Sequence, residues 1–429
     1  MGKLIYIIGA GPGAQNLLTG EAREALAESE HIIGAERLLE SLETLIKGKK
    51  KDALVAGEAI AEAIRRSANK THAVLVTGDS GFFSLSKRLV PLLKTEAARE
   101  NWEIKVLCGI NSVSCLASKL NVAYDGAVIK SYHGRLNMDA PAQDKERLLN
   151  ELAGLAARSR QCFFLTDKIV SPRLICGALA ERGLDELCVS VGERLSYPDE
   201  KIISGKVNEL LGRDFDSPNV VYIENGKLKQ KNGVNPPVHS PVNPKDADFI
   251  RGAVPMTKEE VRAISLAKLW LKPEAVCWDL GAGTGSVSCA MALAVPYGRV
   301  YAVEKDAEAI ELIKQNKEKF DCYNIKIIEG EAPAALADLP PPDSAFIGGS
   351  SGALRDIIRE ITGKNPYAHI VINAVTLETL NSITEIIAEN HFPGAEIAQI
   401  GVNVFQKTGK YQLLRAQNPV FVISFGGEA

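Results

Sequence analysis

The sequence predicts two α/β domains in one chain of 429 residues. Three observations predict this: the chain is too long for one ordinary core, apolar strand-length runs alternate with helix-like stretches, and a glycine-rich turn occurs in each half. The turns lie at Gly9–Gly13 and Gly281–Gly285, each after an apolar run. Because glycine lacks a Cβ atom, the backbone at such turns can approach a nucleotide-like ligand closely.

The composition is that of a soluble globular protein. Apolar residues make up 46% and charged residues 24%, as in soluble globular proteins, and the net charge of −3 gives no general attraction for nucleic acid or an anionic membrane. The eight cysteines and six histidines form no metal-ligand pattern, so no metal is expected. No signal-peptide pattern or membrane-length apolar run is present, and a cytoplasmic location is expected.

A segment rich in proline and asparagine divides the chain. Residues 231–244 hold four prolines and three asparagines with almost no bulky apolar residues, which is typical of a stiff, extended linker. We therefore predict one domain over residues 1–232, a linker over 233–246 and a second domain over 247–429.

The first domain alternates strands and helices. Thr19 is the predicted N-cap of a helix over 19–28, with Glu21 and Glu24 in its first turn, and a second helix is predicted over 59–66. Strands are predicted at 3–8, 31–34, 73–77, 104–107, 127–130, 161–165, 189–191 and 220–223. Several end in small or polar residues, where open α/β sheets bind ligands.

The second domain is a more regular series. Thr257 and Glu260 suggest a capping box for a helix over 258–270. Strands are predicted at 275–279, 299–304, 325–329, 344–347, 369–373, 396–406 and 420–424, and further helices at 286–294, 306–320, 351–361 and 377–389. This order predicts a doubly wound parallel sheet with an antiparallel end.

The second turn favours a cationic ligand. Its glycines, Gly281, Gly283 and Gly285, are spaced G-x-G-x-G, whereas a dinucleotide site has G-x-G-x-x-G. Asp279 ends the preceding strand, and its carboxylate would repel a pyrophosphate but attract the amino and sulfonium groups of S-adenosylmethionine. Glu304 ends the next strand, where a carboxylate can accept hydrogen bonds from both ribose hydroxyls. Ala332 follows the third strand and can support the adenine ring.

Residues 248–429 resemble the decarboxylating precorrin C15-methyltransferases. The resemblance lies in the motifs at 255–262, 279–285, 347–352, 373–378 and 418–420. It implies a class I S-adenosylmethionine methyltransferase fold, similar to the Rossmann fold. Together with Asp279, the donor-binding positions it implies are Thr257, Gly281, Ala282, Gly283, Thr284, Gly285, Glu304 and Ala332.

The first glycine-rich turn, Gly9–Gly13, does not by itself indicate a ligand. Pro12 removes an N–H group that a phosphate site would use, so a plain strand-to-helix turn is an equal interpretation. With the strand ends at 77–83, 108–112 and 165–167, residues 1 to about 230 resemble the two-lobed tetrapyrrole methylases. The motifs at 131–135 and 192–196 are similar to the precorrin C5-methyltransferase branch. The donor-binding positions implied are Gly9, Gly11, Pro12, Gly13, Gly78, Asp79, Ser80, Phe82, Asn111 and Ser112.

Both halves in this order resemble the fused precorrin C5,15-methyltransferases. The resemblance implies a tetrapyrrole substrate with many carboxylates, one S-adenosylmethionine site per domain, and self-association. Methyl transfer needs alignment rather than a nucleophilic side chain. His133 and Arg135 are catalytic candidates, although a packing or substrate-orienting role is the stronger interpretation for His133. Basic candidates for the substrate carboxylates are Arg251, Lys258, Lys407, Lys410 and Arg415, each of which taken alone is more often a solvated charge.

Three other functions stay open from the sequence. A methyltransferase acting on another acceptor such as RNA is disfavoured by the negative net charge. A tetrapyrrole carrier or sensor without activity is disfavoured by the intact acidic and glycine positions of the second turn. A nicotinamide oxidoreductase is disfavoured by the glycine spacing.

Overall fold

The structure is a computed structural model that describes residues 2–228, 242–390, 392 and 394–427. By contact the chain divides into two compact units, one of residues 1–138, 159–177 and 185–234 and the other of residues 139–158, 178–184 and 235–429. The domain boundaries expected from the sequence stay a prediction, and residues 233–241 of the expected linker lie outside the described residues. No helix in the described part is long and apolar enough to span a membrane.

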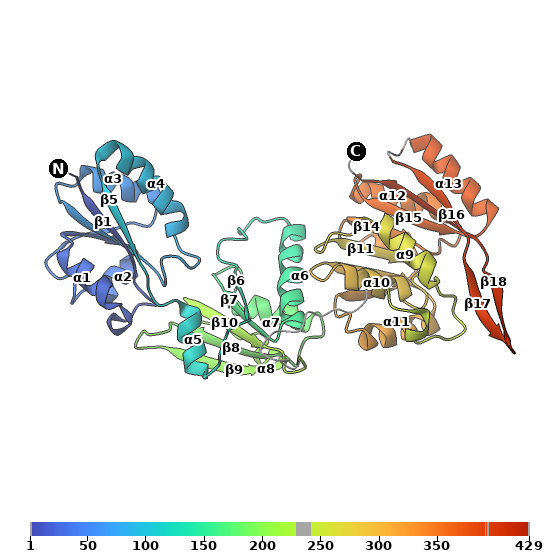
Figure 1. Ribbon diagram of the computed structural model, residues 1–429, viewed down its shortest axis with the longest axis horizontal. Helices are drawn as coiled ribbons and strands as arrows, with labels where there is room; N and C mark the ends of the chain where they lie inside the picture. The colour runs from blue at the N-terminus through green and yellow to red at the C-terminus, as the bar shows by residue number, and fades with distance from the viewer. Residues whose placement is uncertain (1, 229–241, 391, 393, 428–429) are drawn as a thin grey trace. The chain divides into compact units, whose positions relative to one another are not determined.

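The first lobe of the first unit is a parallel five-stranded sheet in the order β3-β2-β4-β1-β5 (Figure 1). Its strands are β1 (Leu4–Gly9), β2 (His31–Gly34), β3 (Lys50–Ala53), β4 (Thr71–Val76) and β5 (Glu103–Leu107). Its helices are α1 (Gly20–Glu28), α2 (Glu36–Ser41), α3 (Gly57–Arg66) and α4 (Ser86–Glu100). Apolar side chains of α1 and α2 cover one face of the sheet and those of α3 and α4 cover the other.

The second lobe is a mixed sheet in the order β6-β7-β10-β8-β9, in which only β6 and β7 are parallel. Its strands are β6 (Val128–Ser131), β7 (Gln161–Leu165), β8 (Cys188–Glu193), β9 (Lys201–Lys206) and β10 (Asn219–Glu224). The remaining helices before residue 229 are α5 (Ser112–Leu120), α6 (Ala142–Arg158), α7 (Pro172–Ala180) and α8 (Val207–Leu210). Buried side chains of α5 pack on this sheet, whereas α6 falls in the second unit by contact.

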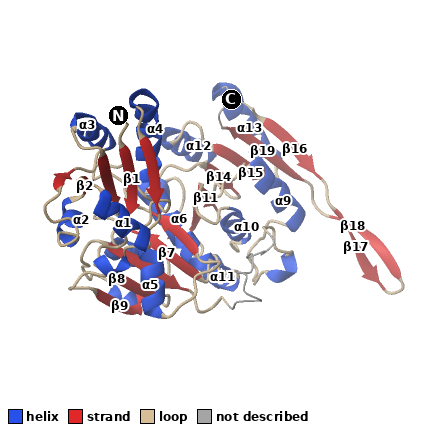
Figure 2. Ribbon diagram, turned by 60° about the vertical axis from the view of Figure 1, so that its left-hand side comes forward, coloured by secondary structure: helices blue, strands red, loops and turns tan. Residues whose placement is uncertain are grey.

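The second unit is built on a seven-stranded sheet in the order β13-β12-β11-β14-β15-β19-β16, parallel except for β19. Its strands are β11 (Val276–Leu280), β12 (Arg299–Glu304), β13 (Ile325–Glu329), β14 (Ser344–Ile347), β15 (His369–Ala374), β16 (Glu396–Ile400) and β19 (Val420–Gly426). Its helices are α9 (Glu259–Lys268), α10 (Ser286–Ala294), α11 (Ala307–Lys319), α12 (Leu354–Lys364) and α13 (Leu377–Asn390). Helices α9, α10 and α11 cover one face of the sheet and α12 and α13 cover the other (Figure 2), with their apolar side chains in the two cores. The α/β class predicted from the sequence is confirmed.

Two expectations for the second unit are wrong. The strand predicted over 396–406 is two strands, β16 and β17 (Asn403–Thr408), and β17 pairs with the unpredicted β18 (Tyr411–Ala416) in a hairpin that extends from the rest of the unit (Figure 2). Residues 406–410 are the end of β17 and its turn. The capping box is also absent, because α9 begins at Glu259 with Lys258 as its N-cap and no side chain bonds the cap.

Three backbone turns of the first lobe meet at the carboxyl ends of β1, β4 and β5. A Cβ atom on Gly109 would lie 2.4 Å from the carbonyl oxygen of Gly9 and 2.5 Å from that of Gly78. Gly11 and Gly78 exchange backbone hydrogen bonds of 3.1 and 2.8 Å. Space therefore requires glycine at Gly9 and Gly109, whereas a positive φ favours it at Gly11 and Gly78.

We predict that Gly109→Ala lowers the free energy of unfolding by about 3 kcal/mol, because the added methyl group overlaps backbone atoms that cannot rotate away. Gly20→Ala is the matched control, since a Cβ atom at Gly20 in α1 meets nothing within 4 Å. Its helix propensity should instead stabilise the protein by about 0.5 kcal/mol. Scanning calorimetry measures both, and equal stability of the two variants would contradict the crossing.

Candidate functional site

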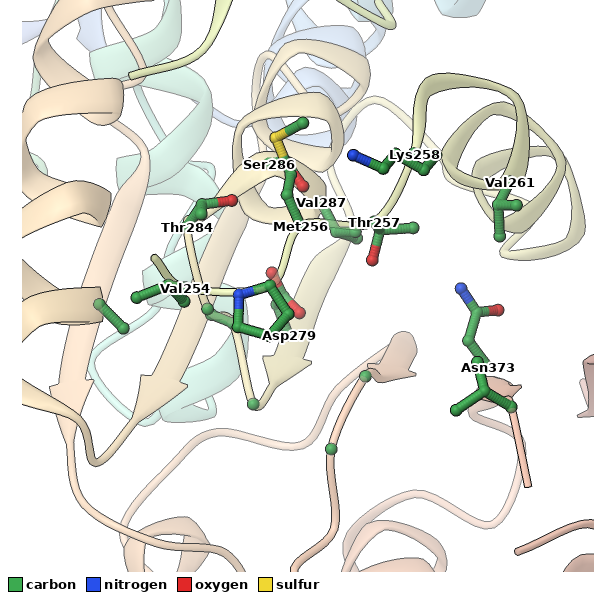
Figure 3. A pocket seen from close by; sticks show the side chains of 18 of the residues that line it. Val254, Met256, Thr257, Lys258, Val261, Asp279, Thr284, Ser286, Val287 and Asn373 are labelled. Atoms are coloured by element: carbon green, nitrogen blue, oxygen red, sulfur yellow. The ribbon is translucent and has the colours of Figure 1, made fainter. Parts of the chain in front are cut away.

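A cavity of about 1290 Å³ lies at the carboxyl ends of the parallel strands in the second unit. Figure 3 shows Asp279, Thr257, Lys258 and Asn373 around it. The residues predicted from the sequence that line it are Thr257, Lys258, Asp279, Gly281, Ala282, Gly283, Thr284, Glu304, Ala332 and Arg415. Doubly wound sheets bind ligands at this edge, so the fold brings most of the predicted second-unit positions to one place.

The carboxylate of Asp279 is buried without a cation beside it. Its exposed fraction is 0%. The hydroxyl of Ser288 on α10 donates a hydrogen bond to Oδ2, while Oδ1 has no partner among the described residues. Burial raises the pKa of Asp279 to about 7, an effect that the Ser288 bond opposes and the charge of Glu304 adds to. A buried, unpaired carboxylate oxygen at a cavity wall is suited to a cationic ligand.

Glu304 holds the glycine turn in place. Its Oε2 accepts a 2.8 Å hydrogen bond from the backbone N–H of Gly283, and its Oε1 accepts bonds of 2.8 and 3.0 Å from those of Lys305 and Asp306. Each carboxylate oxygen can accept more than one hydrogen bond, so capacity for ligand hydroxyls remains. Thr284 adds a buried hydroxyl without a partner among the described residues.

The turn also passes very close to the strand end of β14. A Cβ atom on Gly281 would lie 2.9 to 3.0 Å from the backbone of Gly349, and Gly281, Gly283 and Gly285 all have positive φ angles. Gly285 does not line the cavity, because it packs against Ile313 of α11. Gly281 and Gly283 therefore leave space at the cavity wall, whereas Gly285 allows close packing against α11.

The basic candidates divide into two groups. Lys258 and Arg415 line the cavity, whereas Arg251, Lys407 and Lys410 are exposed and do not. Arg415 on β18 donates a 3.0 Å hydrogen bond to Gln406 on β17. The hairpin therefore brings Arg415, but not Lys407 or Lys410, to the cavity.

Sequence reasoning missed several residues at the cavity. Phe405 and Gln417 come from the unpredicted hairpin and the chain after it. Asn373 is the penultimate residue of β15, and its side-chain oxygen accepts a 3.1 Å hydrogen bond from the Ser265 hydroxyl of α9. Its position as the last residue of a predicted strand was the available signal, and the motif at 373–378 contained it without a role.

One wall of the cavity depends on Arg262. This fully buried side chain donates to the side-chain oxygen of Asn243 at 2.7 Å and to the backbone oxygen of Thr257 at 2.7 Å, and it also bonds Pro244 and Asp246. Its guanidinium lies 4.9 Å from the ring centre of Phe249. These bonds fix the segment that carries Val254 to Lys258 along the cavity.

The predicted positions of the first unit gather around its glycine crossing. Asp79 accepts hydrogen bonds from the backbone N–H groups of Gly81 at 2.8 Å and Gly109 at 2.9 Å. Asn111 caps α5 by accepting from Ser114 N–H. Gly13 packs on the second lobe, since a Cβ atom there would lie 2.5 Å from the Tyr197 ring. The turn is thus a junction between the two lobes of this unit.

Two other features of the first unit bear on its chemistry. His133 and Arg135 are exposed, and Arg135 lies 5.9 Å from the ring centre of Tyr132. A separate pocket of about 480 Å³ is lined by residues that include Ala14, Ile110 and Ser196. The catalytic role of His133 and Arg135 stays a prediction. No group of metal-ligating side chains occurs among the residues that the structure describes.

Comparison with known proteins assigns both parts of the chain. Residues 249–425 match the family described as precorrin methyltransferase domain, and residues 4–211 match the tetrapyrrole (corrin/porphyrin) methylases. A probable cobalt-precorrin-6B C(15)-methyltransferase (decarboxylating) of Pyrobaculum calidifontis is 42% identical over 173 residues, which cover 40% of this chain and 88% of that protein. The chain belongs to the precorrin methyltransferase family. Its first part is a tetrapyrrole methylase domain, so the fusion expected from the sequence is confirmed.

Two further relatives are similar over the precorrin methyltransferase domain. The cobalt-precorrin-6B C(15)-methyltransferase (decarboxylating) of Salmonella typhimurium is 37% identical over 182 residues, covering 42% of this chain and 94% of that protein. The crystal structure of a precorrin-6y C5,15-methyltransferase from Geobacter metallireducens is 36% identical, covers 44% of this chain and 100% of that chain, and has a TM-score of 0.42.

Arg262→Met should destabilise the precorrin methyltransferase domain by about 3–5 kcal/mol, because the oxygens that Arg262 bonds would be buried without donors. Arg359→Met is the control: Arg359 forms an exposed ion pair with Asp356, so its loss should cost less than about 1 kcal/mol. Urea denaturation measures both. Similar losses in the two variants would contradict the role given to Arg262.

Proposed function

We propose that this chain uses S-adenosylmethionine to methylate precorrin-6B or precorrin-6Y, or its cobalt form, at C5 and C15. The reaction at C15 is accompanied by loss of CO₂ from the ring C acetate side chain, as a step of cobalamin biosynthesis. The observation that carries the proposal is the cavity of the precorrin methyltransferase domain, where the buried Asp279 and the turn-holding Glu304 meet.

The residues of this cavity suit the proposed donor. Asp279 Oδ1 and the Thr284 hydroxyl are buried and unpartnered among the described residues, and the close approach of Gly281 to Gly349 leaves no room for side chains there. Asp279 would hold the ammonium group, Glu304 the ribose hydroxyls and Ala332 the adenine. S-adenosylmethionine supplies an electrophilic methyl group on a sulfonium.

The protein's own part is alignment and charge balance. A ring carbon must lie in line with the methyl group, and positioning of two reactants is worth several orders of magnitude in rate. Lys258 and Arg415 line the same cavity and would bind carboxylates of the tetrapyrrole, Arg415 by paired hydrogen bonds. Departure of CO₂ leaves an electron pair that the conjugated ring accepts, so no nucleophilic side chain is needed.

The tetrapyrrole methylase domain would carry the C5 reaction with a second donor site. Support comes from the crossing of the turns at Gly9, Gly78 and Gly109, which places three strand ends together and leaves bare backbone there. His133 and Arg135 are exposed and stay candidates for orienting the substrate. One donor site per domain is part of this proposal.

Self-association and a cytoplasmic location complete the proposal. The hairpin of β17 and β18 exposes apolar side chains, with exposed fractions of 72% for Phe405 and for Tyr411 and 60% for Leu414. Exposed apolar clusters of this kind commonly mark contacts between proteins, and we assign this one to another copy of the chain. The net charge of −3 favours a small-molecule acceptor over RNA.

The test is incubation of the full chain with methyl-labelled S-adenosylmethionine and either metal-free or cobalt-loaded precorrin, with methyl groups and CO₂ counted by mass spectrometry. We expect two methyl groups added and one CO₂ lost on one of the two substrates. Absence of both products on both substrates would contradict the proposal.

Asp279→Ala should abolish C15 methylation and CO₂ loss while C5 methylation survives, because it removes the carboxylate proposed to hold the ammonium group. Asp79→Ala should impair only C5 methylation, since it frees the N–H groups of Gly81 and Gly109. Asp338→Ala, at an exposed position, is the control. Loss of both activities in a folded Asp279 variant would contradict independent sites.

A further inference from the structure

Among the residues that the structure describes, none places a positive charge where it would balance an ionised Asp279 carboxylate. Among the described residues, its hydrogen-bond donors are the hydroxyl and the backbone N–H of Ser288 on α10, both of them neutral. The charged group that acts on it from β12 is Glu304, which is negative, and the titratable neighbour on α10 is the buried Cys289 thiol. Lys258 lines the cavity, but no bond or ion pair joins it to Asp279 among the described residues. Leaving a buried charge unpaired is costly, and a carboxyl group avoids this by binding a proton.

We infer that Asp279 holds a proton while the cavity contains no cation, and releases it to solvent when the ammonium group of S-adenosylmethionine binds. Cofactor binding to this domain is therefore coupled to proton release. In this step only the O–H bond of the carboxyl group breaks, its electron pair stays on the carboxylate, and the proton passes to water or buffer. The inference rests on the proposed function, because that function supplies the cation.

The direction of the pKa shift agrees with this geometry. Burial raises the pKa of Asp279 to about 7, so about half of the empty sites are protonated at pH 7. A bound cation favours the ionised form and lowers that pKa. Below pH 7 the affinity should therefore fall by up to about tenfold per pH unit, because binding must then displace a full proton.

Ser288 acts as a positioning residue in this scheme. Its hydroxyl bonds Oδ2 and leaves Oδ1 for the ligand, and it also favours the ionised form. Ser288→Ala should move the pH at which affinity begins to fall to a higher value, so that binding at pH 7 is weaker than in the unmodified chain. Ser344→Ala is the matched control, because Ser344 is equally buried and bonds the backbone oxygen of Leu269 instead.

Titration calorimetry of the full chain with S-adenosylmethionine at pH 7, in phosphate and in Tris, measures the protons released. The two buffers differ in ionisation enthalpy, so the difference in heat gives the proton count. We expect about half a proton more for the unmodified chain than for Asp279→Asn, which cannot ionise. The proposed donor site in the tetrapyrrole methylase domain contributes equally to both chains and cancels.

Equal proton counts in the two chains, or an affinity that stays constant from pH 6 to pH 8, would overturn the inference. Circular dichroism and thermal unfolding confirm that Asp279→Asn is folded before the comparison. The proposed function is tested separately. If the C15 product never forms, the proposed function is wrong. If the product forms without proton release, only the inference about Asp279 is wrong.

Discussion

The second unit depends on one electrostatic constraint: two parallel neighbouring strands end in carboxylates at one cavity, and one of these carboxylates is fully buried. Asp279 is the penultimate residue of β11, and its Oδ1 has no partner among the described residues, whereas Glu304 ends β12 and bonds the backbone of the glycine turn. Two acidic groups at one site disfavour phosphate and favour a ligand that is positive and rich in hydroxyl groups. This constraint distinguishes the site from the pyrophosphate-binding sites of dinucleotide-binding sheets.

In both domains glycines allow backbone segments to approach one another closely, but the arrangement of these glycines differs. In the precorrin methyltransferase domain, Gly281 passes within Cβ contact distance of Gly349 from the adjacent strand. In the tetrapyrrole methylase domain, three turns cross at Gly9, Gly78 and Gly109, and Asp79 bonds the third of them. The first turn is informative only through these partners, which come from distant parts of the sequence.

Buried strands were predictable because their apolar runs have clear ends. The strand ranges 161–165, 299–304, 325–329 and 344–347 agree with β7, β12, β13 and β14. The position of Asp279 and Glu304 at strand ends followed from those runs. The family resemblance added the donor-binding positions of the first domain, which local pattern alone did not supply.

Features that depend on tertiary contacts were not predictable in this way. Helix α4 contains Pro91 and has no side-chain N-cap bond, so its start signal is missing from the sequence. Residues of β18 are all exposed, and an exposed hairpin shows no alternation of apolar and polar residues. In the sequence alone, Arg262 resembles a surface charge on a helix. Its burial depends on its contacts with the segment from Asn243 to Thr257, which the sequence pattern does not show.

The central claim is that two independent donor sites, one in each domain, serve one tetrapyrrole. Native mass spectrometry of the full chain at increasing S-adenosylmethionine concentration tests it most directly, because it counts bound molecules without requiring the scarce acceptor. We expect saturation at two molecules per chain. Saturation at one molecule per chain would contradict the claim.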